Sequence, residues 1–167
     1  MKVITYGNPV LRKKAKRIKN IDKDILRLVD NMFKTMHTNE PQGVGLAAPQ
    51  VGVPIALFVY ELDDDKGVII NPEIIEKKGS EVGEEGCLSV PGIFGPVERA
   101  TEIVVKAINL KGKRITLKLK GFKARVFQHE TDHLNGILFT DYIKNIDDLE
   151  VEEGYELPEK LAERFRE

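Results

Sequence analysis

Two histidines four residues apart constrain the fold of this chain more than any other feature of its sequence. His129 and His133 lie in residues 122–134, a segment without glycine or proline that stops at Asn135-Gly136. Positions i and i+4 share one face of a helix, so both imidazoles can point at one ion. Glu130 directly follows the first histidine and is placed to reach a water beside that ion. The segment therefore predicts a helix that carries two metal ligands. A surface helix with two histidines by chance is the weaker alternative.

The rest of the chain predicts strands bracketed by helices. Apolar residues recur at helical spacing from Asn20 to His37, with Asn20 or Asp22 as the cap. Turns or loops are expected at residues 43–50, 63–67 and 92–96, and a short third helix at Leu157–Phe165. Asn71-Pro72 should end one strand, and Asn109–Lys113 should join two others as a hairpin. The expected strands are Ile55–Tyr60, Val68–Ile70, Ile74–Ile75, Ile103–Ile108 and Ile115–Leu119.

This order of elements predicts an α+β fold. We expect mixed or antiparallel sheets packed around the central helix, with an N-terminal helix and a short C-terminal helix. A length of 167 residues fits one catalytic domain spanning 1–167, because a chain of that size can bury an ordinary core.

Composition excludes some classes of protein and partner. No apolar run approaches the roughly 18 residues that cross a bilayer, and the N-terminus is too short and mixed for a signal peptide. The single cysteine cannot form an internal disulfide, which favours a reducing, cytoplasmic setting. The 26 basic and 27 acidic residues nearly cancel, so no membrane contact and no specific nucleic-acid recognition is expected. We interpret the basic run within Leu11–Lys19 as a solvated segment.

A catalytic metal usually has a third protein ligand and an open position. Cys87, within Glu84–Ser89, is one candidate, because glycine and polar neighbours suit an exposed backbone edge. A lone cysteine is, however, more often a small buried apolar residue. Acidic residues after the helix are the other option, as in zinc peptidases, and the residues alone leave both open. Those acids are Asp141, Asp147, Asp148, Glu150, Glu152 and Glu153.

Three short motifs in order, Gly43–Gln50, Glu85–Ser89 and Gln128–Leu134, make the sequence resemble the peptide deformylases. The resemblance implies a metal-dependent hydrolase of protein biosynthesis and N-terminal processing. It would remove the formyl group from the N-terminal formylmethionine of newly made polypeptides and release formate. By the same resemblance Cys87, His129 and His133 hold the metal, and Glu130 is the general base and then the general acid. Gln50 and the backbone N–H of Leu88 would stabilise the oxyanion.

The resemblance also suggests where substrate binds. The methionine side chain would lie near Val44, Phe122, Val126 and His129, and Arg125 would contact substrate through its stem. Substrate backbone would pair with the edge near Val44 and Gly86. Gly43 and Gly45 would allow close approach of substrate or supply turn dihedrals. Glu85 and Ser89 would orient the loop around the cysteine. From its place between the histidines, Asp132 would support a ligand or pair with Arg99, and an ordinary solvated acid is an equal alternative.

The ligand chemistry and the family resemblance predict different metals. One cysteine with two histidines favours zinc, which binds such donors more tightly than ferrous iron. The family typically works with ferrous iron, so we expect one Fe(II) ion natively, with zinc, nickel or cobalt after purification. A transient contact with the ribosome is a further expectation. The alternatives are a zinc metallopeptidase and a catalytically silent deformylase-like binding module.

Overall fold

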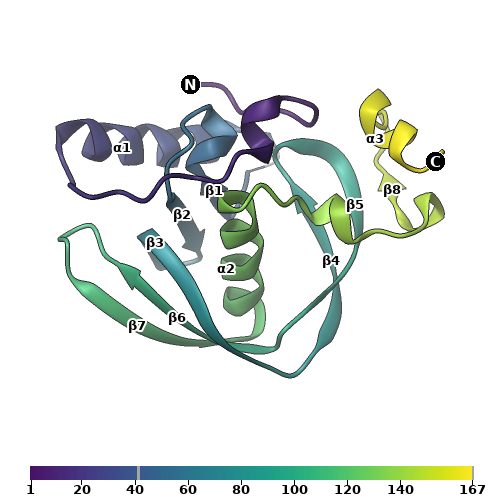
Figure 1. Ribbon diagram of the computed structural model, residues 1–167. Coiled ribbons are helices and arrows are strands. Elements are labelled where there is room, and N and C mark those ends of the chain that lie inside the picture. Colours follow the sequence, from purple (N-terminus) through teal and green to yellow (C-terminus); the bar gives the residue numbers. More distant parts are fainter. Residues whose placement is uncertain (41, 167) are drawn as a thin grey trace.

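The central element of the fold is helix α2 (Gly121–Leu134). A computed structural model describes residues 1–40 and 42–166. Figure 1 shows α2 between a five-stranded sheet and a three-stranded sheet. The strands within both sheets pair antiparallel. The predicted α+β fold is therefore confirmed, including the N-terminal helix α1 (Lys23–Thr38) and the short C-terminal helix α3 (Glu159–Arg164).

A side-chain hydrogen bond caps the start of helix α1 and an apolar face buries its side. The Asp22 carboxylate accepts a hydrogen bond from the backbone N–H of Ile25 at 3.0 Å, so Asp22 rather than Asn20 is the cap. Val29, Met32 and Met36 form the buried face of α1 and pack with Leu57 and other residues of the large sheet. None of the described helices is long and apolar enough to cross a membrane.

The large sheet has the strand order β1-β2-β3-β6-β7. Its strands are β1 (Gly45–Ala47), β2 (Leu57–Leu62), β3 (Asp65–Lys78), β6 (Glu102–Ile108) and β7 (Arg114–Lys120). The hairpin predicted between the last two is confirmed. The turn expected at residues 63–67 is shorter, because β2 and β3 are joined by residues 63 and 64 alone. Residues 43–50 are not wholly a loop either, since β1 lies within them and the 3-10 helix η2 (Ala48–Val51) follows it.

The predicted break at Asn71-Pro72 is wrong. Strand β3 runs through it, with a shift in register between Ile70 and Glu73. Asn71 adopts a positive φ of 51°, and its side chain bonds both the N–H and the C=O of Ile18, each at 2.8 Å. This bulge accommodates a proline that has no N–H to donate.

A second sheet, in the order β4-β5-β8, covers the other side of α2. It consists of β4 (Glu81–Cys87), β5 (Val90–Arg99) and β8 (Glu150–Val151). The loop expected at residues 92–96 is wrong, because these residues lie inside β5. Glycine and proline hide the strand pattern there, but Ile93 and Val97 bury their side chains against Phe139 and Ile143.

Packing of α2 fixes which face of the helix is left for chemistry. Phe127 is fully buried, and its ring lies 5.1 Å from those of Phe58 and Tyr60 on β2. Leu134 is buried at the helix end, where Asn135 and Gly136, with φ of 74°, stop the helix as predicted. The face that carries His129 and His133 is thereby turned toward the end of β4.

Candidate active site

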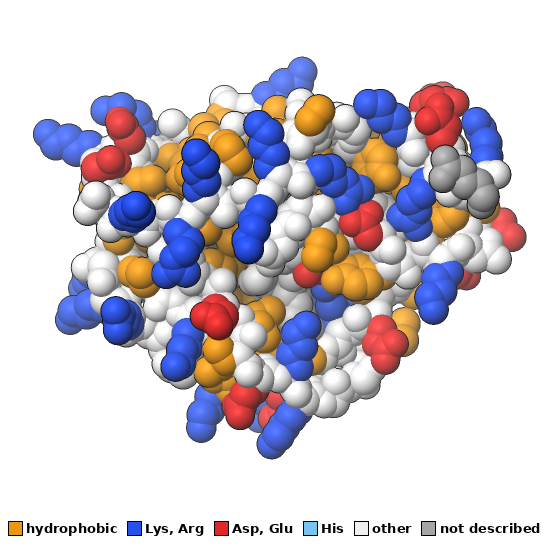
Figure 2. All heavy atoms as spheres, viewed as in Figure 1, with side chains coloured by type: hydrophobic (Ala, Val, Ile, Leu, Met, Phe, Trp, Pro, Cys, Tyr) orange, Lys and Arg blue, Asp and Glu red, His pale blue; other side chains and the backbone are white. Residues whose placement is uncertain are grey.

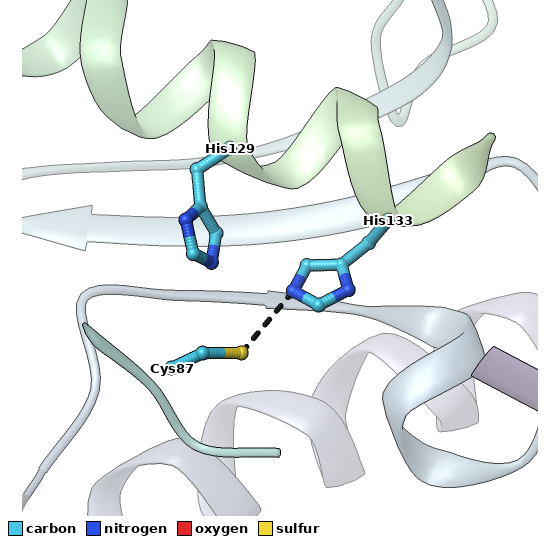
Figure 3. A group of neighbouring side chains, drawn as sticks. All are labelled: Cys87, His129 and His133. Carbon is cyan, nitrogen blue, oxygen red and sulfur yellow. Dashed lines mark hydrogen bonds between the residues drawn. The ribbon is translucent and has the colours of Figure 1, made fainter. Parts of the chain in front are cut away.

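Cys87, His129 and His133 converge in space. Their ligand atoms all lie within 4.8 Å of one another, and Cys87 Sγ is 3.3 Å from His133 Nε2. Figure 3 shows both rings projecting from α2 toward the cysteine. Nitrogen and sulfur ligands of one tetrahedral ion lie about 3.5 Å apart, so this donor set fits a single ion with a small adjustment. Within residues 1–40 and 42–166 it is the only such group, and the acids after the helix do not join it.

The carboxylate of Glu85 orients His129 from behind. Glu85 Oε1 lies 2.8 Å from His129 Nδ1 and also accepts a bond from Arg99, while Oε2 accepts from Arg99 and Arg125. Burial by itself would raise the pKa of Glu85, but the hydrogen bonds from Arg99 and His129 outweigh it and lower that pKa to about 2. An ionised Glu85 accepts the Nδ1 proton of His129, which leaves Nε2 free for a metal.

The charge cluster extends beyond Glu85. Arg99 Nη1 lies 2.6 Å from Asp132 Oδ2, so Asp132 pairs with Arg99. Tyr142 donates its hydroxyl to the same oxygen at 2.7 Å, and its ring lies 4.9 Å from the Arg99 guanidinium. Tyr142 lies after the end of α2 at Leu134 and belongs to no motif. The sequence therefore carries no signal that would have identified it.

The guanidinium of Arg125 is bonded to protein groups. Its guanidinium donates to Glu85, to the carbonyl oxygen of Val97 at 2.9 Å and to that of Glu81 at 2.8 Å. These bonds tie α2 to both long strands of the small sheet. Its polar head is thus occupied by protein groups, although the side chain still lines the cavity described below.

Glu130 is a buried carboxylate beside the histidine rings. Burial raises its pKa to about 7, and His129 opposes that rise. Glu130 Oε1 is buried and has no hydrogen-bond partner among the described residues. A Cβ atom on Gly45 would lie only 2.6 Å from Glu130 Oε2. Gly45 does not have a positive φ, so it is not needed for a turn dihedral. A glycine is needed here because the Glu130 side chain lies close to the backbone of residue 45.

Gln50 is held with its amide nitrogen toward the cysteine. Its Nε2 is 3.4 Å from Cys87 Sγ and 3.0 Å from Ser89 Oγ, and its Oε1 accepts from the N–H of Ala47 at 2.9 Å. Gln50 is 1% exposed. These contacts leave the amide one orientation, in which it donates into the site.

A cavity of about 250 Å³ opens beside these groups. Cys87, His129 and Glu130 line it, and His133 lies outside its lining. Phe122 and Val44 form an exposed apolar rim, at 60% and 42% exposure. Strand β5 supplies a wall that includes Val90, Pro91, Ile93 and Phe94, of which the last two were expected to lie in a loop. The other residues expected near substrate all line the cavity: Gly43, Gly45, Gln50, Gly86, Leu88, Arg125 and Val126.

A family model for polypeptide deformylase matches residues 1–148. The chain belongs to the polypeptide deformylase family. A peptide deformylase of Halothermothrix orenii is 51% identical over 148 residues, which cover 87% of this chain and 95% of that protein. One from Dehalococcoides mccartyi is 46% identical over 165 residues, covering 97% of this chain and 98% of the relative.

Solved deformylase structures share the fold. The crystal structure from Thermotoga maritima superposes with a TM-score of 0.81 at 45% identity, over 85% of this chain and 96% of that one. A Met-Ala-Ser-bound structure from Acinetobacter baumannii gives 0.81 at 37% identity, over 86% and 98%. Family membership makes this chain a metal-dependent hydrolase that removes the N-terminal formyl group of new polypeptides. It favours neither the zinc metallopeptidase nor the silent binding module.

Proposed function

We propose that Cys87, His129 and His133 hold one divalent ion and that Glu130 moves the protons of formyl hydrolysis. The grouping of the three ligand atoms within 4.8 Å, beside a buried carboxylate, is the observation that supports this assignment. When bound, such an ion polarises a carbonyl oxygen and lowers the pKa of water toward neutrality. We propose Fe(II) as the native ion, because the deformylase family typically works with ferrous iron, although the donors alone would favour zinc. Zinc, nickel and cobalt fit the same donors.

Glu130 acts first as base and then as acid. Water attacks the formyl carbon and gives a proton to Glu130, whose carboxylate oxygen has no competing partner among the described residues. The bond from the formyl carbon to the amine nitrogen then breaks, and Glu130 returns the proton to that nitrogen. The products are formate and a free amino terminus. A pKa of about 7 suits both transfers near neutral pH.

Gln50 and Leu88 stabilise the negative charge that develops on the formyl oxygen. The Gln50 amide is already aimed at the site, because its own oxygen is bonded to Ala47 and its nitrogen lies near Cys87. Leu88 follows the cysteine and lines the cavity, so its backbone N–H is the second donor. Donors fixed before the reaction need no reorganisation when the charge appears.

The substrate is a polypeptide that begins with formylmethionine. A formyl carbon carries only hydrogen, and we infer that the site beside Glu130 admits this small group and excludes larger acyl groups. The methionine side chain lies against Val44, Phe122 and Val126, which line the cavity. Substrate backbone pairs with β1 near Val44 and with β4 at Gly86, because each is an edge strand of its sheet. The deformylase from Acinetobacter baumannii, whose structure holds Met-Ala-Ser, supports a peptide with this first residue.

The same assignment implies where the enzyme works. Newly made polypeptides emerge from the ribosome in the cytoplasm, and we infer a transient contact with the ribosome there. We also infer that residues 1–167 act as one catalytic domain.

Anaerobic purification, metal analysis and a formate assay test the assignment together. Enzyme loaded with ferrous ion is expected to release formate from formyl-Met-Ala-Ser. Cys87→Ala should lose the metal and the activity, whereas Glu130→Gln should keep the metal and lose activity. Full metal content in Cys87→Ala would contradict the ligand set, and no formate from the ferrous enzyme would contradict the reaction.

A further inference from the structure

The end of the chain packs along the small sheet. Figure 1 shows β8 and α3 beside β5. Leu149 and Leu161 are buried in one apolar cluster together with Ile93 of β5. Figure 2 shows charged side chains on the outer surface where α3 lies in Figure 1. Residues 149–166, which we call the C-terminal segment, therefore pack their apolar side chains inward, and they begin where the family match at residues 1–148 ends.

The part of β5 that lines the active-site cavity is not paired with β4. Cys87 pairs with Val90 and Gly86 pairs with Phe94, so in the described chain residues 91–93 have no partner on β4. All three of these residues line the cavity. Backbone groups that leave a sheet ladder must find other partners or remain in water. This bulged stretch of the cavity wall thus depends on contacts from elsewhere in the chain.

The C-terminal segment supplies those contacts. The N–H of Glu152 donates to the carbonyl oxygen of Gly92 at 2.8 Å, and Ile93 pairs with Val151 of β8. Gly92 has a φ of 75°, and a Cβ atom on it would overlap Cγ of Tyr155, so the Tyr155 side chain lies directly on this glycine. None of the described residues that line the cavity belongs to the C-terminal segment. The segment therefore supports the wall from outside the cavity.

The position of Tyr155 is itself fixed. Its N–H donates to the carbonyl oxygen of Glu152 at 3.1 Å, which closes a turn in which Gly154 has a φ of 90°. Farther along the segment, Arg164 of α3 donates to the carbonyl oxygen of Thr140 at 2.6 Å. The tyrosine thus lies between two attached parts of the segment, and its contact with β5 is not that of a free tail.

We propose that Tyr155 and the backbone bond from Glu152 position the β5 wall of the cavity for substrate binding. The proposal rests on the proposed function, in which this cavity receives a formylmethionyl peptide. Phe94 links the wall to the strand that the substrate backbone follows, because a Cβ atom on Gly86 would lie 2.6 Å from Cε1 of the Phe94 ring. Tyr155 is a positioning residue, since it supports this wall without lining the cavity.

A role confined to covering the apolar cluster predicts a different result. Loss of the Tyr155 ring would then lower the unfolding temperature and leave KM and kcat unchanged. Positioning of the wall predicts a higher KM at nearly constant kcat, because Glu130 and the proposed metal ligands lie on α2 and β4. A wall that is correctly placed in only about a fifth of the molecules weakens apparent substrate binding about fivefold.

The test uses two matched pairs of variants of the full chain loaded with ferrous ion. Tyr155→Ala removes the ring, whereas Tyr155→Phe keeps it. Glu152→Pro removes the N–H that donates to Gly92. Glu153→Pro is its control, because the N–H of Glu153 has no backbone partner in the described chain and proline is favoured at the second position of such a turn. The measurements are KM and kcat for formyl-Met-Ala-Ser, metal content, unfolding temperature, and hydrogen exchange of residues 90–97 by mass spectrometry.

Tyr155→Ala and Glu152→Pro should each raise KM about fivefold. In both variants kcat should stay within about twofold of wild type. Metal content should be unchanged, and residues 90–97 should exchange faster. Tyr155→Phe and Glu153→Pro should behave as wild type in every measurement.

An unchanged KM in folded Tyr155→Ala, or an equal rise in KM in Tyr155→Phe, would overturn the positioning role. If Tyr155→Ala does not fold, an equal KM in Glu152→Pro and Glu153→Pro overturns it, and a higher KM in Glu152→Pro alone supports it. Absence of formate from the wild-type enzyme would instead count against the proposed function.

Discussion

The carboxylate of Glu85 lies 2.8 Å from Nδ1 of His129, on the side of the ring away from the cysteine. Two arginines hold that carboxylate in place, with Nε of Arg99 at 2.9 Å and Nη1 of Arg125 at 2.7 Å. The imidazole therefore has one tautomer and one orientation before any ion binds. The conformational entropy of the His129 side chain is therefore lost on folding and not on metal binding, which should strengthen metal binding.

Glu85→Gln should weaken metal binding by about 10- to 100-fold, because a neutral amide holds the His129 proton less strongly. Competition with a chelator of known affinity measures the change. Glu84→Gln removes a carboxylate from the exposed neighbouring position and should leave the affinity unchanged. Equal affinities in the Glu85 variant and wild type would show that the carboxylate does not act through the ring.

The same carboxylate should make the metal-free protein sensitive to acid. Its pKa is about 2 in the folded chain and 4.5 as the ordinary value, so folding favours the ionised form. This stabilisation is complete above pH 4.5 and is lost as the pH falls toward 2. The free energy of unfolding should decrease by up to about 3 kcal/mol over that window. Denaturant titrations of wild type and Glu85→Gln measure it; parallel pH profiles for the two proteins would contradict the prediction.

Gln50→Ala should reduce kcat by about 10²- to 10³-fold, because one donor to the developing oxyanion is removed. Metal content should remain at the wild-type level, since Gln50 is not among the converging ligands. Initial rates on formyl-Met-Ala-Ser and metal analysis measure both quantities. Ser89→Ala is the matched control, because it removes the other partner of the Gln50 amide and keeps the donor itself. A larger loss of rate in Ser89→Ala than in Gln50→Ala would argue against the oxyanion role.

Gly45→Ala should lower kcat strongly while the metal stays bound. The new Cβ would lie 2.6 Å from Glu130 Oε2 and would displace that carboxylate from its position. Gly43→Ala is a useful contrast, because its Cβ would meet the end of the flexible Leu88 side chain at 2.8 Å. Rates and unfolding temperatures for the two variants separate displacement of Glu130 from general destabilisation. Wild-type kcat in Gly45→Ala would show that the carboxylate tolerates the shift.

Periodic segments of the sequence were sufficient to predict most of the large sheet and the helices. Residues 20–37 and 122–134 have helical spacing, and the paired runs 103–108 and 115–119 alternate as strands. The small sheet was not predicted, because the glycines and prolines of Val90–Arg99 break the alternation that marks a strand. At Asn71-Pro72 the local turn signal predicted a strand end, but β3 continues there. The bonds between Asn71 and Ile18 hold the chain in the strand.

Local spacing and residue chemistry by themselves predicted a helix with two histidines and an adjacent glutamate. They left two candidates for the third ligand, the cysteine and the acids after the helix. Only the tertiary structure brings Cys87, and none of those acids, close to both rings within the described residues, because the end of β4 and α2 must first pack together. The same holds for the joining of Glu85, Arg99, Asp132 and Tyr142. Contacts between residues far apart in the chain depend on packing of the whole core, which no short stretch of sequence encodes.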